Sequence, residues 1–271
     1  AALCANAIPE RKIAAVYDAS SSFPLYLHPE GDGLKLSTGR QPNFSSAFLK
    51  ALAASLGLPQ SKPHGVPAGL APEDIFHYVY ALFHSPGYRY RYAEFLKVDF
   101  PRLPLTGSLG LFRALARLGG ELAAFHLFES PKLAKPVSEF LGGRNSRIEK
   151  ISWSRNTVWI DKAQTTGFMG VPEDVWNFHI GGYQVCNKWL KDRKGRTLSK
   201  GDIVHYQKII VALVETIRLM KEIDGVIENH GGWPGAFVAG GVSEDTGEEL
   251  RKVAQPSAEY RTGGTRRGKR K

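Results

Sequence analysis

The spacing of apolar residues changes twice along this 271-residue chain, and these changes constrain its fold more than any other feature. Between residues 72 and 125, apolar side chains recur every three or four positions, as on one face of an α-helix. Between residues 148 and 161 they alternate with polar side chains, which is typical of β-strands. Helical spacing returns from residue 203 to 224. We therefore predict an α+β fold in which a helical subdomain packs with a small β-containing subdomain and a long C-terminal helix.

Helix start signals place the first strong helix of the helical region. Proline suits the first helical position and acidic residues suit the first turn, so Pro72-Glu73-Asp74 should begin a helix. We expect this helix to end at Ser85-Pro86-Gly87, because proline and glycine break helices. Three further helices are expected here and upstream, over residues 44–56, 88–96 and 111–125.

The alternating region predicts a β-hairpin with strands over residues 148–153 and 157–161, joined by Ser154-Arg155-Asn156. A short helix should follow, since four apolar side chains fall on one face of it: Val185, Cys186, Trp189 and Leu190. Ser199-Lys200-Gly201-Asp202 has the pattern of a capping box. It should open the long helix, which we expect to close near Asp224-Gly225.

Positive charge is unevenly distributed along the chain. There are 36 Lys and Arg against 26 Asp and Glu, a net charge of +10. Five of these excess charges lie in the last nine residues, where a basic run is more often a solvated tail than a binding surface. Residues 151–200 hold eight basic and four acidic residues, so most of the remaining excess lies there.

The segment from Gln184 to Arg196 has the composition of a nucleic-acid-binding surface. It gathers five cations, which would neutralise phosphates. Three of them, spaced three apart, are predicted to share one side of a helical turn: Lys188, Lys191 and Lys194. Gln184 and Asn187 are residue types that can form paired hydrogen bonds with adenine. The alternative is a solvated helix face that binds nothing.

Two loops add further hydrogen-bond donors. They are the hairpin tip Ser154-Arg155-Asn156 and the loop Arg144-Asn145-Ser146-Arg147, although ordinary turns use the same residue types. The complete set of candidate DNA-binding residues is Arg144, Asn145, Arg147, Ser154, Arg155, Asn156, Gln184, Asn187, Lys188, Lys191, Arg193, Lys194 and Arg196.

Familiar catalytic and metal-binding patterns are missing from the sequence. It contains no phosphate-binding GxxxxGK[ST] loop, no GxGxxG, no HExxH and no GxSxG. Cys4 and Cys186 stand in no CxxC pattern. We therefore expect no catalytic residue and no metal site in this chain. With no apolar run of membrane-spanning length and no leader-like opening, a cytoplasmic protein that does not bind membranes is expected. Because the sequence begins at Ala1 rather than Met, we expect a piece of a longer polypeptide.

Nine segments, taken in order, carry a family resemblance. They are FPLYL at 23–27, IFHYVYALFHSP at 75–86, YR at 88–89, YAEFLK at 92–97, DFPRLP at 99–104, VPEDVW at 171–176, IGGYQV at 180–185, KWLKDR at 188–193 and MKEID at 220–224. Together they resemble the C-terminal target-recognition (specificity) region of Type ISP restriction–modification enzymes, over roughly residues 20–237. Those are large single-chain bacterial proteins that join nuclease, translocase, N6-adenine methyltransferase and specificity domains.

The resemblance implies a function in DNA recognition. A chain of this kind would bind a short asymmetric sequence in double-stranded DNA, so that linked domains can flip and methylate an adenine and cleave the DNA. S-adenosylmethionine and ATP with Mg²⁺ would then bind only to upstream domains that are absent here, and no cofactor is expected on this chain. The methyltransferase and translocase domains would be partners, in the parent polypeptide or as separate subunits. Whether this chain is itself part of an enzyme stays open.

The resemblance and the composition together divide the chain into four parts. We expect an N-terminal loop-rich segment that follows a methyltransferase domain (1–65), a helical part (66–140), a β-containing recognition part with the long helix (141–237) and a disordered basic tail (238–271). The alternative function is a protein-interaction scaffold, whose helices over 72–128 dock a methyltransferase or motor domain without base readout.

Overall fold

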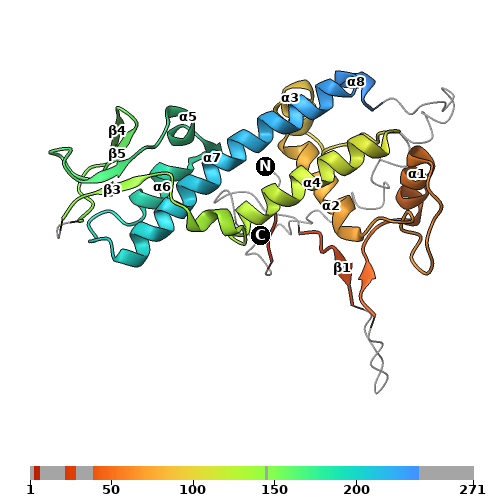
Figure 1. Ribbon diagram of the computed structural model, residues 1–271, viewed down its shortest axis with the longest axis horizontal. Helices are drawn as coiled ribbons and strands as arrows, with labels where there is room; N and C mark the ends of the chain where they lie inside the picture. Colours follow the sequence, from red (N-terminus) through yellow and green to blue (C-terminus); the bar gives the residue numbers. More distant parts are fainter. Residues whose placement is uncertain (1–2, 7–21, 29–38, 144–145, 238–271) are drawn as a thin grey trace, which may run out of the picture.

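One long helix, α7 (Lys200–Asn229), runs from the sheet-bearing end of the molecule to its helical end (Figure 1). The structure is a computed structural model, and it describes residues 3–6, 22–28, 39–143 and 146–237. At 1.5 Å per residue, the 30 residues of α7 extend about 45 Å. The four-stranded sheet lies at one end of the molecule and α1 (Ser46–Leu56) lies at the other. The predicted α+β fold with a long C-terminal helix is therefore confirmed.

The start of α7 was predicted correctly and its end was not. Ser199 Oγ accepts a hydrogen bond from the Asp202 N–H at 3.1 Å, and the Asp202 carboxylate accepts one from the Ser199 N–H at 3.0 Å, which is the expected capping box. The helix does not close near Asp224-Gly225, because Ile227 and the preceding Ile223 are fully buried. Asp224 instead accepts hydrogen bonds from the Ser85 hydroxyl and, at 2.9 Å, from the Gly87 N–H.

Helices α2 (Pro72–His84) and α4 (Leu109–His126) pack against each other at the centre of the helical end. The predicted α4 stripe is buried completely, in Leu111, Leu115, Leu118, Leu122 and Phe125. Further elements of this end are α3 (Pro86–Arg91), α8 (Gly232–Gly235) and the 3₁₀ turns η1 (Phe95–Lys97) and η2 (Pro131–Ala134).

The second predicted helix begins earlier and ends sooner than expected. Helix α2 ends at His84, as Ser85-Pro86-Gly87 predicts. Pro86 and Gly87 also form the first turn of α3, because the Ser85 hydroxyl caps that helix by accepting from the Tyr88 N–H at 3.0 Å. Helix α3 ends at Arg91, and residues 95–97 form η1 instead. Helix α1 starts two residues later than expected, since the Ser45 hydroxyl accepts from the Phe48 N–H.

The sheet is antiparallel with strand order β3-β6-β5-β4. Its strands are β3 (Glu139–Leu141), β4 (Ser152–Ser154), β5 (Thr157–Trp159) and β6 (Gly167–Met169). Strands β4 and β5 are the predicted hairpin, with shorter strands than expected. Two-residue ladders form elsewhere, between β1 (Tyr26–Leu27) and β2 (Gln41–Pro42) and between β7 (His179–Ile180) and β8 (Tyr183–Gln184). Helices α5 (Glu173–Trp176) and α6 (Val185–Lys191) pack in the same hydrophobic core as the sheet.

Helix α7 contributes to two hydrophobic cores. Tyr206, Ile210 and Leu213 pack with Val158 of β5 and other residues of the sheet end. Leu219 and the two isoleucines that follow pack with α2 and α4. Between them, residues 209–213 are all buried, so the middle of α7 is enclosed on every side. The division of the chain into four parts stays a prediction, and its tail, 238–271, lies outside the described residues.

A buried chain of hydrogen bonds links the N-terminal segment to α2, α4 and α7. Thr216 donates its hydroxyl proton to the Ala212 carbonyl at 2.7 Å, so its oxygen accepts from His126 Nε2–H at 3.0 Å. His126 Nδ1 therefore accepts from the Tyr80 hydroxyl at 2.6 Å, and the Tyr80 oxygen accepts from the Cys4 thiol at 3.3 Å. This order satisfies each group when His126 is neutral. Burial, with a smaller contribution from the Arg89 cation, accordingly lowers the pKa of His126 to about 4.

Close packing of α2 on α4 depends on Gly119. A Cβ atom at this position would lie 1.9 Å from the His77 carbonyl oxygen, so the Gly119→Ala variant must separate the two helices. We expect it to lose at least about 1–3 kcal/mol of unfolding free energy in urea titrations. The matched control is Gly225→Ala, at an exposed position within α7 where a Cβ meets nothing within 4 Å. That variant should gain up to about 1 kcal/mol, and equal effects of the two substitutions would contradict this account.

Acid should weaken the fold through His126. The unfolded side chain titrates near pH 6.5 and the folded one near pH 4, so the unfolded state binds more protons as the pH falls through this window. The contribution of neutral His126 to the free energy of unfolding is therefore fully present above about pH 6.5 and is lost toward pH 4. At about pH 4.5 the loss is on the order of 2 kcal/mol. In urea unfolding at both ends of this window, His126→Gln should lose less stability on acidification than the parent chain. An identical loss in both proteins would contradict the assignment.

Candidate nucleic-acid interface

A turn rich in cations follows α6 and is anchored to a distant segment. We call residues 191–196 the basic turn. Gly195 adopts φ +83°, which favours glycine, and its N–H donates to the Ile148 carbonyl at 2.8 Å. The Ile148 N–H donates in return to the Arg196 carbonyl at 2.9 Å, and the Leu198 N–H donates to the Ser146 carbonyl at 3.0 Å. Backbone pairing therefore fixes the basic turn beside residues 146–148.

This pairing brings Arg147 to the basic turn. Arg147 Nε donates to the Gly195 carbonyl at 3.1 Å, so its guanidinium is held at the turn while the side chain stays exposed. Lys191, Lys194 and Arg196 are exposed as well. Among the residues that the structure describes, no carboxylate lies within ion-pair distance of these four cations. Their charge is therefore uncompensated within the described part of the chain.

Arg193 has a different environment from its neighbours. Its guanidinium lies over the Trp189 ring, 3.7 Å from the ring centroid, and donates to the Trp189 carbonyl at 3.1 Å. Its Nε also lies 3.8 Å from Asp202 Oδ1, at the start of α7. Only 32% of the side chain is exposed. These contacts tie the basic turn to α6 and α7, so Arg193 is occupied with holding the turn in place.

Lys188 and Lys194 do not lie as expected. Lys194 lies beyond the end of α6 at Lys191, in the turn made by Gly195, so the predicted shared helical side holds only for Lys188 and Lys191. Lys188 forms an ion pair with Asp192, one helical turn away, and its ammonium lies 5.6 Å from the centre of the Tyr183 ring. Its charge is therefore partly compensated.

Gln184 and Asn187 hydrogen-bond to each other. The Gln184 side-chain N–H donates to the Trp176 carbonyl at 2.6 Å, and its oxygen accepts from the Asn187 amide at 3.2 Å. Both hydrogen-bonding ends of the Gln184 amide are thus engaged within the protein. Asn187 keeps its side-chain oxygen for another partner.

The hairpin tip is held rigidly. The Asn156 carbonyl accepts from the Gly170 N–H at 2.9 Å and from the Val171 N–H at 2.8 Å. Ser154 Oγ accepts from Trp159 Nε1 at 2.9 Å, so this hydroxyl supports the hairpin. Arg155 and Asn156 both adopt positive φ, +49° and +55°, and both are exposed.

Arg147 with the basic turn and the hairpin tip lie at opposite ends of the β4–β5 hairpin. Glu149 and Lys150 both donate to the Ile160 carbonyl, so the hairpin continues away from its tip toward Ile148. Ser154 lies six positions after Ile148, a distance of up to about 20 Å in extended chain. The structure therefore joins Arg147 to the basic turn but separates both from the hairpin tip. Arg144 and Asn145 lie outside the described residues.

The sequence did not indicate the groups that build this surface. Trp189 and Asp202, which hold Arg193, were assigned only to an apolar face and a helix cap. The pairing of residues 146–148 with 195–198 joins segments about 50 positions apart, and neither has a regular strand pattern. Gly195 within Lys194-Gly195-Arg196 was the one local signal of a tight turn.

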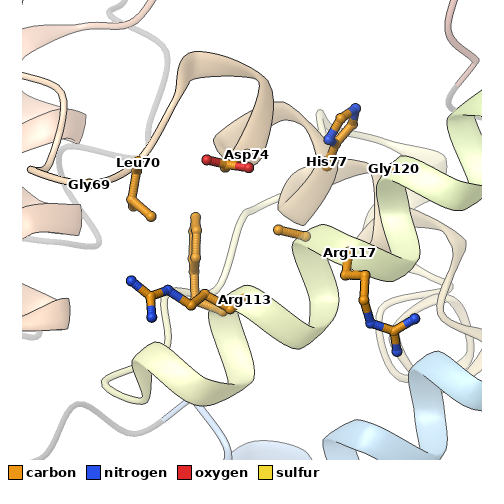
Figure 2. A pocket seen from close by; sticks show the side chains of 9 residues that line it. Gly69, Leu70, Asp74, His77, Arg113, Arg117 and Gly120 are labelled. Carbon is orange, nitrogen blue, oxygen red and sulfur yellow. The ribbon is translucent and has the colours of Figure 1, made fainter.

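A hollow between α2 and α4 is lined in part by side chains that are engaged within the protein (Figure 2). It has a volume of about 350 Å³, and Asp74, His77, Arg113 and Arg117 line it. Asp74 accepts from the Ala71 N–H at 2.8 Å at the start of α2, while Arg117 pairs with Glu121 at 2.7 Å and with Glu222 of α7 at 3.4 Å. Burial lowers the pKa of His77. These contacts serve the packing of the helices.

Two general features concern the described residues as a whole. No helix there combines the length and the apolar composition that a membrane crossing needs. Over the same residues, His, Cys, Asp and Glu side chains form no group of three or more that could hold a metal ion.

Comparison with known proteins gives matches to one family model and to solved structures. A model described as the Type ISP C-terminal specificity domain matches residues 1–222. The fold is similar to part of a cryoEM structure of a DrdV–DNA complex, with 23% identity and a TM-score of 0.51 over 68% of this chain and 20% of that one. It is also similar to part of the ATP-dependent Type ISP restriction-modification enzyme LlaBIII bound to DNA, with 19% identity and a TM-score of 0.50 over 73% and 13% of the two chains. This chain thus spans a fifth or less of those chains. No curated protein matches.

The environment of Arg193 predicts a structural effect that its neighbours lack. Arg193→Ala removes the stacking on Trp189 and the hydrogen bond to its carbonyl, and should lower the unfolding free energy by about 1–2 kcal/mol. Lys194→Ala, at the next position, should change it by less than about 0.5 kcal/mol. Urea unfolding of the two variants provides the measurement. A loss for Lys194→Ala as large as that for Arg193→Ala would show that Arg193 is no special anchor.

Proposed function

This chain belongs to the Type ISP C-terminal specificity domain family, and we propose that it recognises a target sequence in double-stranded DNA. The observation that carries the proposal is the group of uncompensated cations at the basic turn. Arg147, Lys194 and Arg196 meet there around Gly195 from two segments of the chain. Both solved structures described above are complexes with DNA, which supports the same partner for this chain.

The basic turn suits phosphate binding for three physical reasons. Its backbone is fixed by pairing with residues 146–148, so little conformational freedom is lost on binding. Arg147, Lys191, Lys194 and Arg196 are not neutralised by carboxylates of the described residues. Neutralising phosphates and releasing their counterions would therefore supply the binding energy. Among the described residues, Arg147 donates only through Nε, which leaves the outer edge of its guanidinium for a phosphate.

A solvated helix face that binds nothing explains these features less well. Cations on such a face are commonly paired at i,i+4, as Lys188 and Asp192 are. Lys194 and Arg196 instead lie outside the helix, at a turn stabilised by contacts from three directions: residues 146–148, Trp189 and Asp202. Such bracing of a charged surface turn favours a binding role.

In this proposal the contacts to phosphates set the position of the protein along the duplex, and residues outside the basic turn read the bases. The candidates for reading are Asn187, through its side-chain oxygen, and the exposed hairpin tip. The chain from Ile148 to Ser154, which joins the basic turn to the hairpin tip, extends up to about 20 Å, the length of roughly six base pairs of duplex. Recognition here would position the DNA for adenine-N6 methylation and cleavage by linked domains. S-adenosylmethionine and ATP with Mg²⁺ would belong to those domains.

An exposed apolar cluster favours a second candidate function, the docking of a methyltransferase or motor domain. Phe23, Val98 and Phe100 are 75%, 82% and 57% exposed. The two phenylalanine rings meet edge to face, with 6.2 Å between their centres. This cluster is made of different residues from the basic turn, so the two functions are compatible.

Removing a cation from the basic turn should change the salt dependence of DNA binding. For the variants Arg147→Gln, Lys194→Gln and Arg196→Gln, we expect weaker binding to duplexes of every sequence, because interactions with phosphates carry no sequence information. The slope of log affinity against log salt concentration should fall by about 0.9 for each phosphate that is no longer neutralised. Fluorescence anisotropy with random-sequence duplexes, between about 50 and 200 mM salt, measures both quantities.

The matched control is Lys50→Gln, which removes an exposed charge from α1 at the other end of the molecule (Figure 1). It should leave the slope unchanged, apart from a small effect of net charge. If the three variants at the basic turn behave like Lys50→Gln, the basic turn does not bind phosphate. The docking function would then be favoured.

A further inference from the structure

The hairpin tip contains a residue that its turn does not favour. Strands β4 and β5 are joined by two residues, and both adopt positive φ. This is the type I′ geometry, in which Asn or Gly is preferred at the first central position and Gly at the second. Asn156 enters the left-handed region readily, because its short polar side chain tolerates that conformation. Arg155 has no such tolerance, so the turn itself does not explain why an arginine stands there.

The surroundings do not explain Arg155 either. Among the described residues, no hydrogen bond, ion pair or cation–π contact involves its side chain, and the residue is exposed. Its carbonyl oxygen accepts from the Thr157 hydroxyl at 3.2 Å, a contact that any residue could provide. The nearby acidic residues Glu173 and Asp174, at the start of α5, form no ion pair with it.

The same tip is rigid and well placed for presenting a side chain. Its backbone is held by the two hydrogen bonds from Gly170 and Val171 to the Asn156 carbonyl. Trp159 on β5 donates to Ser154, and Trp153 on β4 donates to the Val171 carbonyl at 2.9 Å, so both strands of the hairpin are fixed beside the tip. A two-stranded β-ribbon fits the major groove of B-DNA.

We infer that Arg155 is a specificity-determining residue that reads a guanine in the major groove. Arginine presents two parallel N–H donors, which match the O6 and N7 acceptors at the guanine edge. The inference rests on the proposed function, and assigns to the tip a base-reading role distinct from the phosphate-binding role of the basic turn. A favourable base contact accounts for retention of an arginine in a conformation that glycine would adopt without strain.

The decisive variant is Arg155→Gly, because it should affect stability and recognition in opposite ways. Glycine relieves the positive φ, so the thermal unfolding temperature should stay the same or rise. The side chain that reads the base is removed at the same time. Gln164→Gly is the matched control, because it relieves a positive φ of +55° at another exposed residue, in the loop between β5 and β6. Arg155→Lys keeps the charge without the paired donors.

The measurement is selection of bound duplexes from a library with a randomised central region, followed by sequencing, with the complete chain and each variant. The parent chain should enrich a motif that contains at least one G·C pair. Arg155→Gly should lose discrimination at one G·C position by about 10- to 100-fold and keep the preferences elsewhere. Arg155→Lys should lose most of that discrimination with little change of salt dependence. Gln164→Gly should keep it.

The possible results separate this inference from the proposed function. If the parent chain enriches no motif, the proposed recognition of a target sequence is wrong. If Arg155→Gly enriches the unchanged motif, target recognition stands and the role of Arg155 is overturned. A uniform loss of affinity with a lower salt slope would make Arg155 a phosphate-binding residue instead, and a lowered unfolding temperature would make it a structural residue. Either result also overturns the inference.

Discussion

Burial of α7 on all sides is the constraint on which the rest of the structure depends. Residues 209–213 are enclosed by the sheet on one side and by α4 and its neighbours on the other. A single helix therefore supplies both hydrophobic cores, and since an α-helix is stiff, it also fixes how the two ends lie relative to each other. Asp224 extends the same connection, because its carboxylate holds the Ser85–Gly87 corner between α2 and α3.

The candidate interface depends on the first turn of this helix. Asp202 caps α7 and lies beside Arg193, and Arg193 covers Trp189 of α6. Hydrogen bonds from Ser199 and the Arg193 charge hold the pKa of Asp202 below its usual range, so this anchor stays charged near neutral pH. The basic turn is therefore positioned by the element that organises the core. A surface that gathers more cations than carboxylates is unfavourable by itself, and these contacts keep it in place.

Much of the secondary structure could be predicted because local signals determine it. Apolar periodicity identified α2, α4 and the β4–β5 hairpin, and Ser199 with Asp202 marked the start of α7. The errors arose where distant contacts override local signals. Asp224-Gly225 does not end α7, since burial of Ile227 favours its continuation. Helix α2 ends at His84, as Ser85-Pro86-Gly87 predicts, but the next helix begins directly at Pro86, because the Ser85 hydroxyl caps it. In the candidate site, sequence could supply residue types but not their partners.

By itself, the sequence determined that this chain combines a helical part with a β-hairpin and that much of its excess positive charge lies near residues 184–196. It also indicated the family, through an ordered set of segments, and the family match to residues 1–222 confirms that assignment. Only the tertiary structure decided which cations lie together. Arg147 joins Lys194 and Arg196 through backbone pairing between segments about 50 residues apart, and Gln184 is engaged by Trp176 and Asn187. The physical reason is that each side chain's freedom to bind depends on its neighbours in space, and residue spacing along the chain does not specify them.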